Sequence, residues 1–501
     1  SHFFIKFLYC SSVVENYPDN FSTRSLNSLA RRIVAPAIIS VMINLPQPAQ
    51  TIIDTLKKGG FEAYAVGGSV RDLLMGKSTK GWDFTTNAIP EQILKLFPDS
   101  FYDNQFGTVG IKIYKSTKEK ELQDVYEITT YRNEKGYADH RHPDIISWGK
   151  TIGEDLSRRD FTINAIAFDG KTIIDPFDGQ GDIKQKRIKA VGDPAMRFAE
   201  DALRMMRAIR IAAELGFIID EKTAAAITSN AALLTKISVE RVRDELFRLI
   251  SAPHAADAVL VLKNTGLLHL IIPELEEAFG TAQKSPLRHH IYDVGTHSVM
   301  AVKYCPSSDP LVRLATLLHD IGKPKTFHKD ASELITFYNH EVVGTRMART
   351  IAQRLRLSRH QSEKFLTLIR WHQFSVDERQ TDAAIRRFIR RVGKDNLPDM
   401  LALRIGDRLG GGARETSWRL ELFKKRLEEV QKQPFTVADL AIDGHDVMKE
   451  YTIKPGPMVG KVLKQLFDEV EAGTLPNERE KLLSRLRELK SSFSSPIGPK
   501  E

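Results

Sequence analysis

A pair of glycines, an arginine and a single aspartate form the first group of residues that could do chemistry. Gly67 and Gly68 stand between a short apolar run and a helical pattern, and Arg71 lies in the first turn of that pattern. Glycines at such a turn let backbone N–H groups approach a phosphate, and the start of a helix favours negative charge. Arg71 is placed to pair with phosphate oxygens, and Asp83 in "KGWDFTT" is placed to bind a metal ion. A plain tight turn is the alternative for the glycines taken alone.

Charged residues precede an apolar alternation in "SRRDFTINAIAF", and a polar residue interrupts it. Arg159 and Asp160 lie before the alternation, whereas Asn164 lies inside it, where an amide needs a hydrogen-bonding partner. Arg159 could hold a triphosphate, and Asp160 or Asn164 could hold a ribose hydroxyl.

Four charged residues, Asp201, Arg204, Arg207 and Arg210, recur at every third position of "EDALRMMRAIR". On one continuous helix this spacing predicts a single charged stripe. A carboxylate accepts a hydrogen bond from an exocyclic amine, and a guanidinium donates one to an unprotonated ring nitrogen. Adenine and cytosine both offer that edge, whereas guanine and uracil present a ring N–H that would face the guanidinium unpaired. The stripe therefore predicts selection of ATP and CTP, and a solvated charged face is the alternative.

Histidines and aspartates gather in four later stretches, "HHIYDVGTHSV", "LATLLHDIGKP", "FYNHEVVG" and "LRIGDRLGG". They supply His297, His319, Asp320, His340 and Asp407. Imidazole and carboxylate ligands suit a divalent transition metal. Adjacent His319 and Asp320 in an apolar helix are hard to explain by packing, although a helical spacer without activity is the alternative.

The elements that must position these residues change in type along the chain. Up to about residue 180, strand and helix patterns mix, which predicts one mixed sheet backed by helices. Helices are expected at 48–60, 70–76 and 90–97, and strands at 62–68, 82–86, 107–114 and 124–132. Beyond Asp182 the patterns are helical, beginning with one long helix over 195–217.

Bulk composition excludes some classes of protein. The 501 residues predict roughly three or four domains, and no apolar run is long enough to cross a membrane. Two cysteines make no disulfide framework, which favours a reducing compartment. A net charge of +9 suits a polyanionic partner.

The order of the motifs resembles the class II nucleotidyltransferase family. "VGGSVRDLLMG", "EITTYRNE", "RRDFTINAIA", "DPFDGQGDI" and "GDPAMRFAEDALRMMRAIR" stand in the family's order, over about residues 48–275. This family comprises CCA-adding enzymes, split A- and CC-adding enzymes, and bacterial poly(A) polymerases. The resemblance implies an α+β protein, in which a nucleotidyltransferase head with a mixed β-sheet precedes an all-helical neck, body, HD-like domain and tail.

This resemblance also implies boundaries and roles. The expected parts are a leader or disordered segment at 1–41, the head at 42–180, the neck and body at 181–278, the HD-like domain at 279–430 and a tRNA-binding tail at 431–501. The expected roles are a grip on the triphosphate by Gly68, Arg71 and Arg159, templating of the base by Asp201 and Arg204, and ordering of the neck helix and phosphates by Arg207 and Arg210.

Two further resemblances concern the C-terminal half. "LLHDIGKP" is similar to the HD phosphohydrolase superfamily, whose modules in some bacterial CCA-adding enzymes are metal-dependent phosphodiesterases or phosphatases. The segment 435–483 is similar to the tRNA-gripping tail of the nucleotidyltransferase family. In that tail, Lys454, Gly456, Gly460 and Lys461 are expected to contact RNA phosphates, and a plain helical hairpin is the alternative.

The head departs from its family at one position. The family holds two Mg²⁺ ions, ~3.5–4 Å apart, with two aspartates spaced Asp-x-Asp on one strand. Here Gly81 stands in the first position, which leaves Asp83 and, on a neighbouring strand, Glu127. Three explanations compete: an introduced change that disables the enzyme, a natural loss in a protein that still binds tRNA and nucleotide, or slow catalysis by Asp83 with Glu127.

We therefore expect an enzyme that adds C, C and A to the tRNA 3′ end from CTP and ATP with Mg²⁺, impaired by Gly81. An A-adding or CC-adding specialist, a poly(A) polymerase, a non-catalytic RNA-binding protein and a phosphohydrolase alone are the alternatives. A cytoplasmic location is expected, with organelle targeting by 1–41 as the alternative. Both a monomer and a homodimer are compatible with the sequence.

Overall fold

The computed structural model describes residues 44–79, 81–104, 107–114, 122–135, 145–283, 291–331, 333–374, 377, 379–431 and 437–493. The leader expected at 1–41 lies outside these residues. The chain forms two compact units, one with the residues up to Thr281 together with Ile351–Leu357, the other with Ala282–Thr350 and the residues from Ser358 onward. The finer division into five parts stays a prediction.

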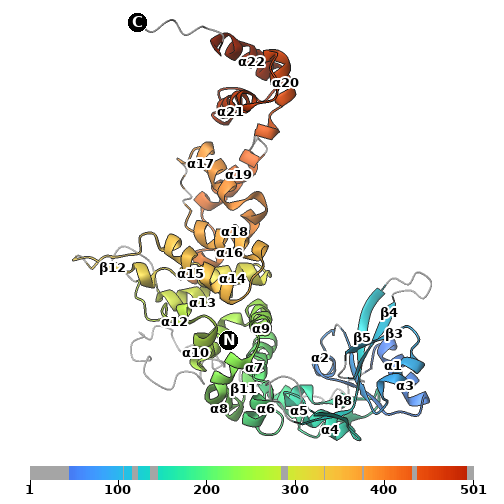
Figure 1. The fold of residues 1–501 in the computed structure, drawn as a ribbon. Coiled ribbons are helices and arrows are strands. Elements are labelled where there is room, and N and C mark those ends of the chain that lie inside the picture. Colours follow the sequence, from blue (N-terminus) through green and yellow to red (C-terminus); the bar gives the residue numbers. More distant parts are fainter. Residues whose placement is uncertain are drawn as a thin grey trace, which may run out of the picture. The chain divides into compact units, whose positions relative to one another are not determined.

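A seven-stranded mixed sheet forms the centre of the head (Figure 1). Its strand order is β3-β4-β5-β2-β1-β8-β9, in which β2 and β5 run parallel and the other neighbours run antiparallel. The bounds are β1 Ala63–Val66, β2 Asp83–Thr86, β3 Ser100–Asn104, β4 Thr108–Tyr114, β5 Leu122–Thr130, β8 Ala167–Phe168 and β9 Ile173–Ile174. The register sets Asp83 opposite Glu127, so two acidic residues lie on adjacent strands.

Four helices accompany this sheet, α1 Gln47–Lys58, α2 Gly68–Leu74, α3 Pro90–Leu96 and α4 Ile152–Ser157. Helix α1 buries the apolar stripe that its period predicts, including Ile53 and Leu56, and it ends at Gly59. That stripe and Ile93 of α3 pack with residues of β1, β2, β4 and β5 in the main core of the head. A smaller cluster joins Val66 of β1 to Leu156 of α4. The expected mixed sheet backed by helices is confirmed.

The rest of the first unit is mostly helical. Its further elements are β6 Arg132–Lys135, β7 Ile145–Trp148, η2 Thr162–Asn164, α5 Gly179–Lys184, β10 Arg187–Ile188, α6 Pro194–Glu200, α7 Leu203–Leu215, β11 Ile218–Ile219, α8 Glu221–Asn230, η3 Ala231–Lys236, α9 Val239–Ser251, α10 Ala255–Asn264, α11 Leu267–Ile271 and α12 Pro273–Glu276.

The single long helix expected over 195–217 is wrong, because the chain breaks it into α6 and α7. Asp201 at the junction is extended, with φ −142° and ψ 103°. Its carboxylate Oδ1 accepts a hydrogen bond from the backbone N–H of Leu203 at 3.0 Å. Aspartate satisfies the free N–H groups of a helix start better than it serves a helix interior, so the residue begins a helix instead of continuing one.

The second unit is built almost entirely of helices. Its elements are α13 Val294–Tyr304, α14 Pro310–Leu318, η4 Pro324–Thr326, β12 His328–Lys329, β13 Ile335–Thr336, α15 His340–Arg354, α16 Arg359–Trp371, α17 Asp382–Val392, η5 Lys394–Asn396, α18 Leu397–Gly410, α19 Trp418–Gln431, η6 Val437–Asp439, α20 Gly444–Tyr451, α21 Pro457–Glu471 and α22 Arg479–Phe493.

Two glycines let helices α13 and α18 approach closely. A Cβ atom at Gly406 would lie 2.6 Å from the Ala301 carbonyl oxygen, and one at Gly410 would lie 2.5 Å from the Ala301 nitrogen. Only hydrogen fits at both positions, so the two backbones can touch. The contact brings His297 on α13 within reach of Asp407 on α18.

The tail has a core of its own, in which α20, α21 and α22 bury Val447, Leu466 and Leu486 among other residues.

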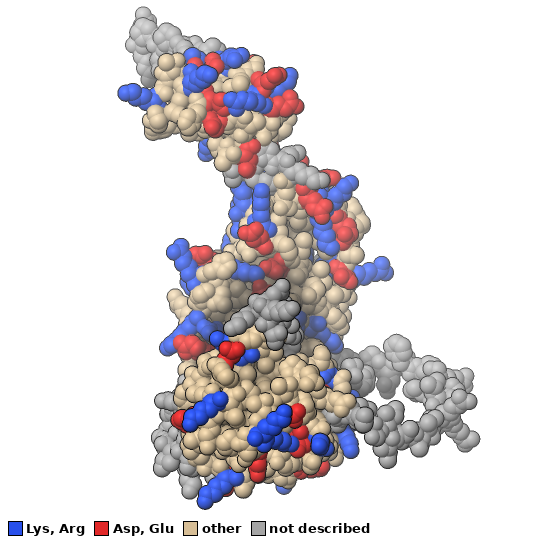
Figure 2. Space-filling view, turned by 90° about the vertical axis from the view of Figure 1, so that its right-hand side faces the viewer, with Lys and Arg blue, Asp and Glu red and all other residues tan. Residues whose placement is uncertain are grey.

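Figure 2 shows basic and acidic side chains interspersed on the coloured surface of one face. Within the described part of the chain, none of the helices combines the length and the apolar character needed to cross a membrane.

Candidate nucleotide site and candidate metal centre

The turn between β1 and α2 brings three predicted residues together. Gly67 has a φ of +80°, and a Cβ there would lie 3.3 Å from both an Arg159 guanidinium nitrogen and an Asp83 carboxylate oxygen. Glycine therefore lets the backbone pass beside these two side chains. The neighbouring Gly68 lies against Arg71, whose Nη2 would be 3.4 Å from a Cβ at Gly68.

Arg71 is held in place by two hydrogen bonds. Its Nη1 donates to Asn164 Oδ1 at 2.8 Å and its Nε donates to Asp72 Oδ1 at 2.9 Å. Asn164 is buried and thus has the partner that its position in the apolar run requires. The amide orients the arginine toward the glycine turn.

The two candidate metal ligands of the head, Asp83 and Glu127, lie opposite each other on the adjacent strands β2 and β5. Partial desolvation raises the pKa of Asp83 above its ordinary value, against the lowering effect of Arg159. Gly81, two residues before Asp83, has a φ of +70°, and its backbone N–H donates to Asp124 Oδ2 at 3.2 Å. Oxygen donors suit Mg²⁺, so Asp83 and Glu127 fit a hard cation by type, but the Asp-x-Asp clamp is incomplete.

A buried aspartate that the sequence did not single out fixes both arginines of "SRRD". Asp155 on α4 is fully buried and accepts from Arg158 Nη2 at 2.6 Å and from Arg159 Nη2 at 3.2 Å. Burial alone would raise the pKa of Asp155, but the two guanidinium groups lower it. The ion pair with Asp155 therefore holds the Arg159 guanidinium in place beside the glycine turn.

Asp160 accepts hydrogen bonds from its own segment of the head and from Arg207 of the neck helix α7. Its Oδ1 accepts from the Phe161 N–H at 2.8 Å and from Asn164 Nδ2 at 3.2 Å, and its Oδ2 accepts from Arg207 Nη2 at 2.6 Å. Burial alone would raise the pKa of Asp160, but Arg207 and then Asn164 lower it to about 2. The pair joins the head to helix α7.

Replacing Asp160 by asparagine is expected to lower the free energy of unfolding by about 2 kcal/mol at pH 7. The pKa of this carboxylate is lower in the folded state than its unfolded value of ~3.9, so its contribution to stability is present above about pH 4 and is lost as the pH falls toward 2. Urea unfolding at pH 7 and pH 3 measures the effect. A difference that is equally large at both pH values would contradict the ion-pair explanation, and Asp169→Asn, at an exposed Lys57 pair, provides a control with a smaller effect.

A cavity of about 280 Å³ lies between the "SRRD" segment and the neck. It is lined by Arg158, Arg159, Asp160, Asp201, Leu203, Arg204, Arg207 and Arg241. Asp201 Oδ2 accepts from Arg241 Nη2 of α9 at 2.8 Å, while Arg204 contacts Glu200 Oε2 at 2.6 Å and the Arg158 carbonyl oxygen at 3.2 Å. Arg241 was not predicted; only the structure brings α9 to this cavity.

The four residues expected on one stripe separate in the structure. Asp201 lies outside α7, and Arg204 and Arg207 line the cavity. Arg210 is buried instead, and it pairs with Glu245 of α9 and Glu214 of α7. Because steps of three residues drift around a helix, the stripe turns inward by Arg210, which therefore ties α7 to α9.

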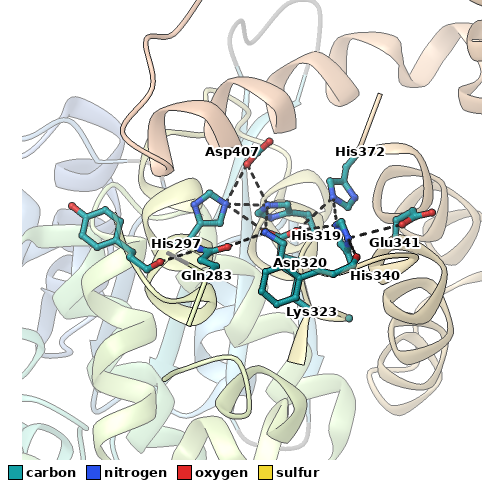
Figure 3. A network of polar contacts seen from close by, with 12 residues as sticks. Gln283, His297, His319, Asp320, Lys323, His340, Glu341, His372 and Asp407 are labelled. Carbon is teal, nitrogen blue, oxygen red and sulfur yellow. Dashed lines mark hydrogen bonds and ion pairs between the residues drawn. The ribbon is translucent and has the colours of Figure 1, made fainter. Parts of the chain in front are cut away.

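The second group of functional side chains lies in the other unit, where four imidazoles converge on Asp320 (Figure 3). Asp320 Oδ2 lies 3.2 Å from His319 Nε2 and 3.6 Å from His297 Nε2. The other oxygen, Oδ1, lies 3.3 Å from His340 Nε2 and 3.6 Å from His372 Nε2. Two triads that could each hold a metal ion thus share one carboxylate.

Asp407 joins the first triad, with its Oδ1 3.2 Å from His297 Nε2 and 3.6 Å from His319 Nε2. The five residues predicted for a metal therefore come together. His372 was not predicted, because a lone histidine at the end of an amphipathic helix gives no metal-binding signal. It lies at the end of α16.

Backbone carbonyls fix which nitrogen of three histidines faces the centre. His319, His340 and His372 each donate from Nδ1 to the carbonyl oxygen of a residue three positions earlier, at 2.7, 2.9 and 2.8 Å. A carbonyl only accepts, so Nδ1 carries the hydrogen and Nε2 is the nitrogen that can bind a metal. The donor set thus fits a transition metal.

The centre also carries strong electrostatic coupling. Burial alone would raise the pKa of Asp320, but His319 and Lys323 hold it well below its ordinary value. Burial alone would lower the pKa of His319, but Asp320 and Asp407 raise it to about 10. Lys323 Nζ lies 2.7 Å from Asp320 Oδ2 and also donates to Gln283.

Comparisons with known proteins identify the domains in which the two candidate sites lie. The chain matches a "Poly A polymerase head domain" over residues 63–189, a "Probable RNA and SrmB-binding site of polymerase A" over 216–279 and an "HD domain" over 288–409. It is 32% identical over 440 residues to the CCA-adding enzyme of Levilactobacillus brevis, covering 87% of this chain and 96% of that one.

The chain belongs to the CCA-adding enzyme family. A CCA-adding enzyme of Geobacillus sp. is 46% identical over 233 residues, which are 46% of this chain and 55% of that one. The crystal structure of the Bacillus stearothermophilus CCA-adding enzyme in complex with CTP superposes with a TM-score of 0.66 at 28% identity, over 90% of this chain and 99% of that one. The resemblance inferred from the motifs is confirmed.

In this member of the CCA-adding enzyme family, the residues expected to contact RNA surround the start of α21. Lys454, Gly456, Gly460 and Lys461 are all exposed, and Gly456 directly precedes the helix. An exposed helix start beside lysines suits phosphate, so RNA contact here stays a prediction with suitable geometry.

Proposed function

We propose that this protein adds C, C and A to the 3′ end of tRNA, using CTP and ATP and releasing pyrophosphate. The observation that carries the proposal is the cavity between the head and the neck. Asp201, Arg204 and Arg159 line this one cavity, which suits a base and a triphosphate of the same nucleotide. Family membership supports the same activity.

The reaction joins the terminal 3′ oxygen of the tRNA to the α-phosphorus of the nucleotide. The bond between the α-phosphorus and the bridging oxygen breaks, pyrophosphate leaves, and the 3′ hydroxyl loses its proton. Mg²⁺, held by Asp83 and Glu127, would supply charge stabilisation at the phosphates. Arg71 and Arg159 are proposed to hold the triphosphate, because their guanidinium groups adjoin the glycine turn.

Replacing Asp201 by alanine is expected to broaden nucleotide choice, with GTP and UTP use rising about 10-fold relative to CTP and ATP. Without the Asp201 carboxylate, the site would no longer favour bases that carry an exocyclic amine at this edge. Single-turnover addition with each of the four nucleotides measures the ratio. Asp193→Ala provides a matched control. Asp193 Oδ1 accepts from the Ala195 N–H at the start of α6, as Asp201 Oδ1 accepts from the Leu203 N–H at the start of α7, but Asp193 does not line the cavity. Unchanged rejection of GTP and UTP in the Asp201 variant would refute the templating role.

Three tRNA substrates separate CCA addition from the related activities. They end before the CCA sequence, after its first two nucleotides, or after the complete sequence. A CCA-adding enzyme extends the first with CTP and ATP, extends the second with ATP, and leaves the third unchanged. Failure on the first substrate would indicate an A-adding specialist, failure on the second a CC-adding one, and long extension of the third a poly(A) polymerase.

A second candidate function is metal-dependent hydrolysis of phosphate esters at the histidine-aspartate centre. The observation that favours it is the sharing of Asp320 between two triads, which suits a pair of divalent ions. The match to the HD domain over 288–409 supports the same chemistry. Loading the protein with Mn²⁺ and measuring release of phosphate from simple esters, with nucleotide addition monitored in parallel, tests this function.

A further inference from the structure

The histidine-aspartate centre opens into a cavity of about 400 Å³ that contains a cation not yet discussed, Arg404. Arg404 lies on α18, one helical turn before Asp407. Its Nη1 lies 3.1 Å from Asp407 Oδ2, and its guanidinium stacks at 5.3 Å from the ring centre of Phe374. Asp407 uses its other oxygen, Oδ1, toward His297 and His319. Arg404 is therefore fixed beside the metal-binding residues but is not one of them.

The Arg404 guanidinium has more N–H donors than its ion pair with Asp407 uses. An arginine side chain carries five N–H groups, and the ion pair with Asp407 uses one of its nitrogens. The Nε of Arg404 is buried and has no hydrogen-bond acceptor within the described part of the chain. Because Arg404 lines the cavity and its ion pair engages only Nη1, the guanidinium can also donate to a ligand that brings oxygen atoms to this end of the cavity.

The number of unesterified oxygens distinguishes phosphate monoesters from phosphate diesters as possible ligands of this cavity. A phosphate monoester has three unesterified oxygens, whereas a diester has two. If the two triads engage two of these oxygens through their ions, only a monoester has a third to offer to a guanidinium. A diester would place an ester oxygen there, with a bulky substituent and little charge, and the guanidinium would stay unpaired.

We propose that Arg404 anchors the third unesterified oxygen of a phosphate monoester and thereby makes this cavity selective for monoesters over diesters. The inference rests on the proposed hydrolytic function of the centre. In the reaction, water forms a bond to phosphorus, the bond from phosphorus to the ester oxygen breaks, and the proton from water ends on the departing alcohol. The products are an alcohol and inorganic phosphate, and no redox partner is needed.

Arg404→Met tests the anchor, because methionine keeps an apolar stem against Phe374 and removes the charge. With Mn²⁺-loaded protein, we expect the KM for p-nitrophenyl phosphate to rise about 30-fold while hydrolysis of bis(p-nitrophenyl) phosphate changes less than about 3-fold. The Kd for inorganic phosphate, measured by calorimetry, should rise at least about 10-fold, with the Mn²⁺ content unchanged. Arg408→Met on the same helix is the matched control, because Arg408 does not line the cavity.

Equal losses on monoester and diester, or loss of bound Mn²⁺, would overturn the anchor and indicate that Arg404 only orients Asp407. An unchanged Kd for phosphate would overturn it as well. If the unaltered protein binds Mn²⁺ but hydrolyses neither ester, the proposed hydrolytic function fails, and the calorimetric comparison of phosphate binding still decides the role of Arg404.

Discussion

Gly81→Asp is expected to raise the rate of nucleotide addition by about 1,000-fold, which corresponds to about 4 kcal/mol of transition-state stabilisation. Attack on a triphosphate develops charge on the attacking and leaving oxygens, and a pair of ions held by carboxylates stabilises both. In the proposed site, Asp83 and Glu127 would supply that clamp without the first aspartate of the Asp-x-Asp pattern. A carboxylate at residue 81, in the segment that leads into β2 two residues before Asp83, would supply the missing ligand.

The backbone at residue 81 can accept the change. A Cβ there would meet no atom within 4 Å, and although the φ of +70° is unusual, aspartate is among the residues that tolerate it. The new carboxylate would lie near Asp124, which already accepts a hydrogen bond from the Gly81 N–H. Two carboxylates in proximity favour a bound cation, which would offset their repulsion.

Gly81→Asn is the matched control, because asparagine has the same shape and the same tolerance of this backbone but carries no charge. Activity in the aspartate variant alone would identify a nucleotidyltransferase disabled by Gly81. Equal, slow addition by the unaltered chain and by both variants would show that Asp83 with Glu127 suffices. If Gly81→Asp adds no nucleotide to tRNA, the transferase proposal fails and a non-catalytic RNA-binding role is favoured.

Asp320→Asn is expected to abolish metal binding at both triads and to reduce ester hydrolysis at least about 1,000-fold. Asp320 presents one oxygen to His297 and His319 and the other to His340 and His372, so a single change weakens both positions. An amide preserves the volume but donates a proton where a ligand is needed. Nucleotide addition at the head should be retained, which verifies folding.

His372→Gln separates the two positions, because His372 belongs to only one triad. We expect elemental analysis to find the metal content of this variant roughly halved, and that of Asp320→Asn close to zero. A full metal complement in Asp320→Asn would contradict the shared-carboxylate arrangement. Equal metal content in His372→Gln and the unaltered chain would remove His372 from the centre.

Much of the head could be predicted because its signals are local. The apolar period of α1, the glycine turn before α2 and the alternation of β2 and β4 are all written in short stretches of sequence. The neck shows the limit of such signals. Asp201 fitted a helical period, but its preference for capping a helix start was stronger, and the expected single helix became two.

Residues that act through distant partners were missed for a different reason. Arg241 reaches Asp201 only because tertiary packing brings α9 to the start of α7. Asp155 contacts Arg158 and Arg159 at the local spacings i,i+3 and i,i+4, and only its complete burial, which comes from the fold, marks it as their support. His372 likewise joins the metal centre across a span of sequence with no spacing rule. Such residues are recognised as buried polar groups with a specific hydrogen-bonding partner, and both burial and partner can be seen only in a three-dimensional structure.

The junction at Asp201 links substrate choice to architecture. Oδ1 of this carboxylate accepts a hydrogen bond from the Leu203 N–H at the start of α7, and Oδ2 accepts one from Arg241 of α9. The same carboxylate lines the cavity that is proposed to hold the base. A substitution that relaxes base choice therefore also removes a helix cap, at a cost of about 1 kcal/mol, and releases an arginine. If Asp201 templates the base as proposed, fidelity and neck stability change together at this position, and a substitution that broadens nucleotide use also destabilises the neck.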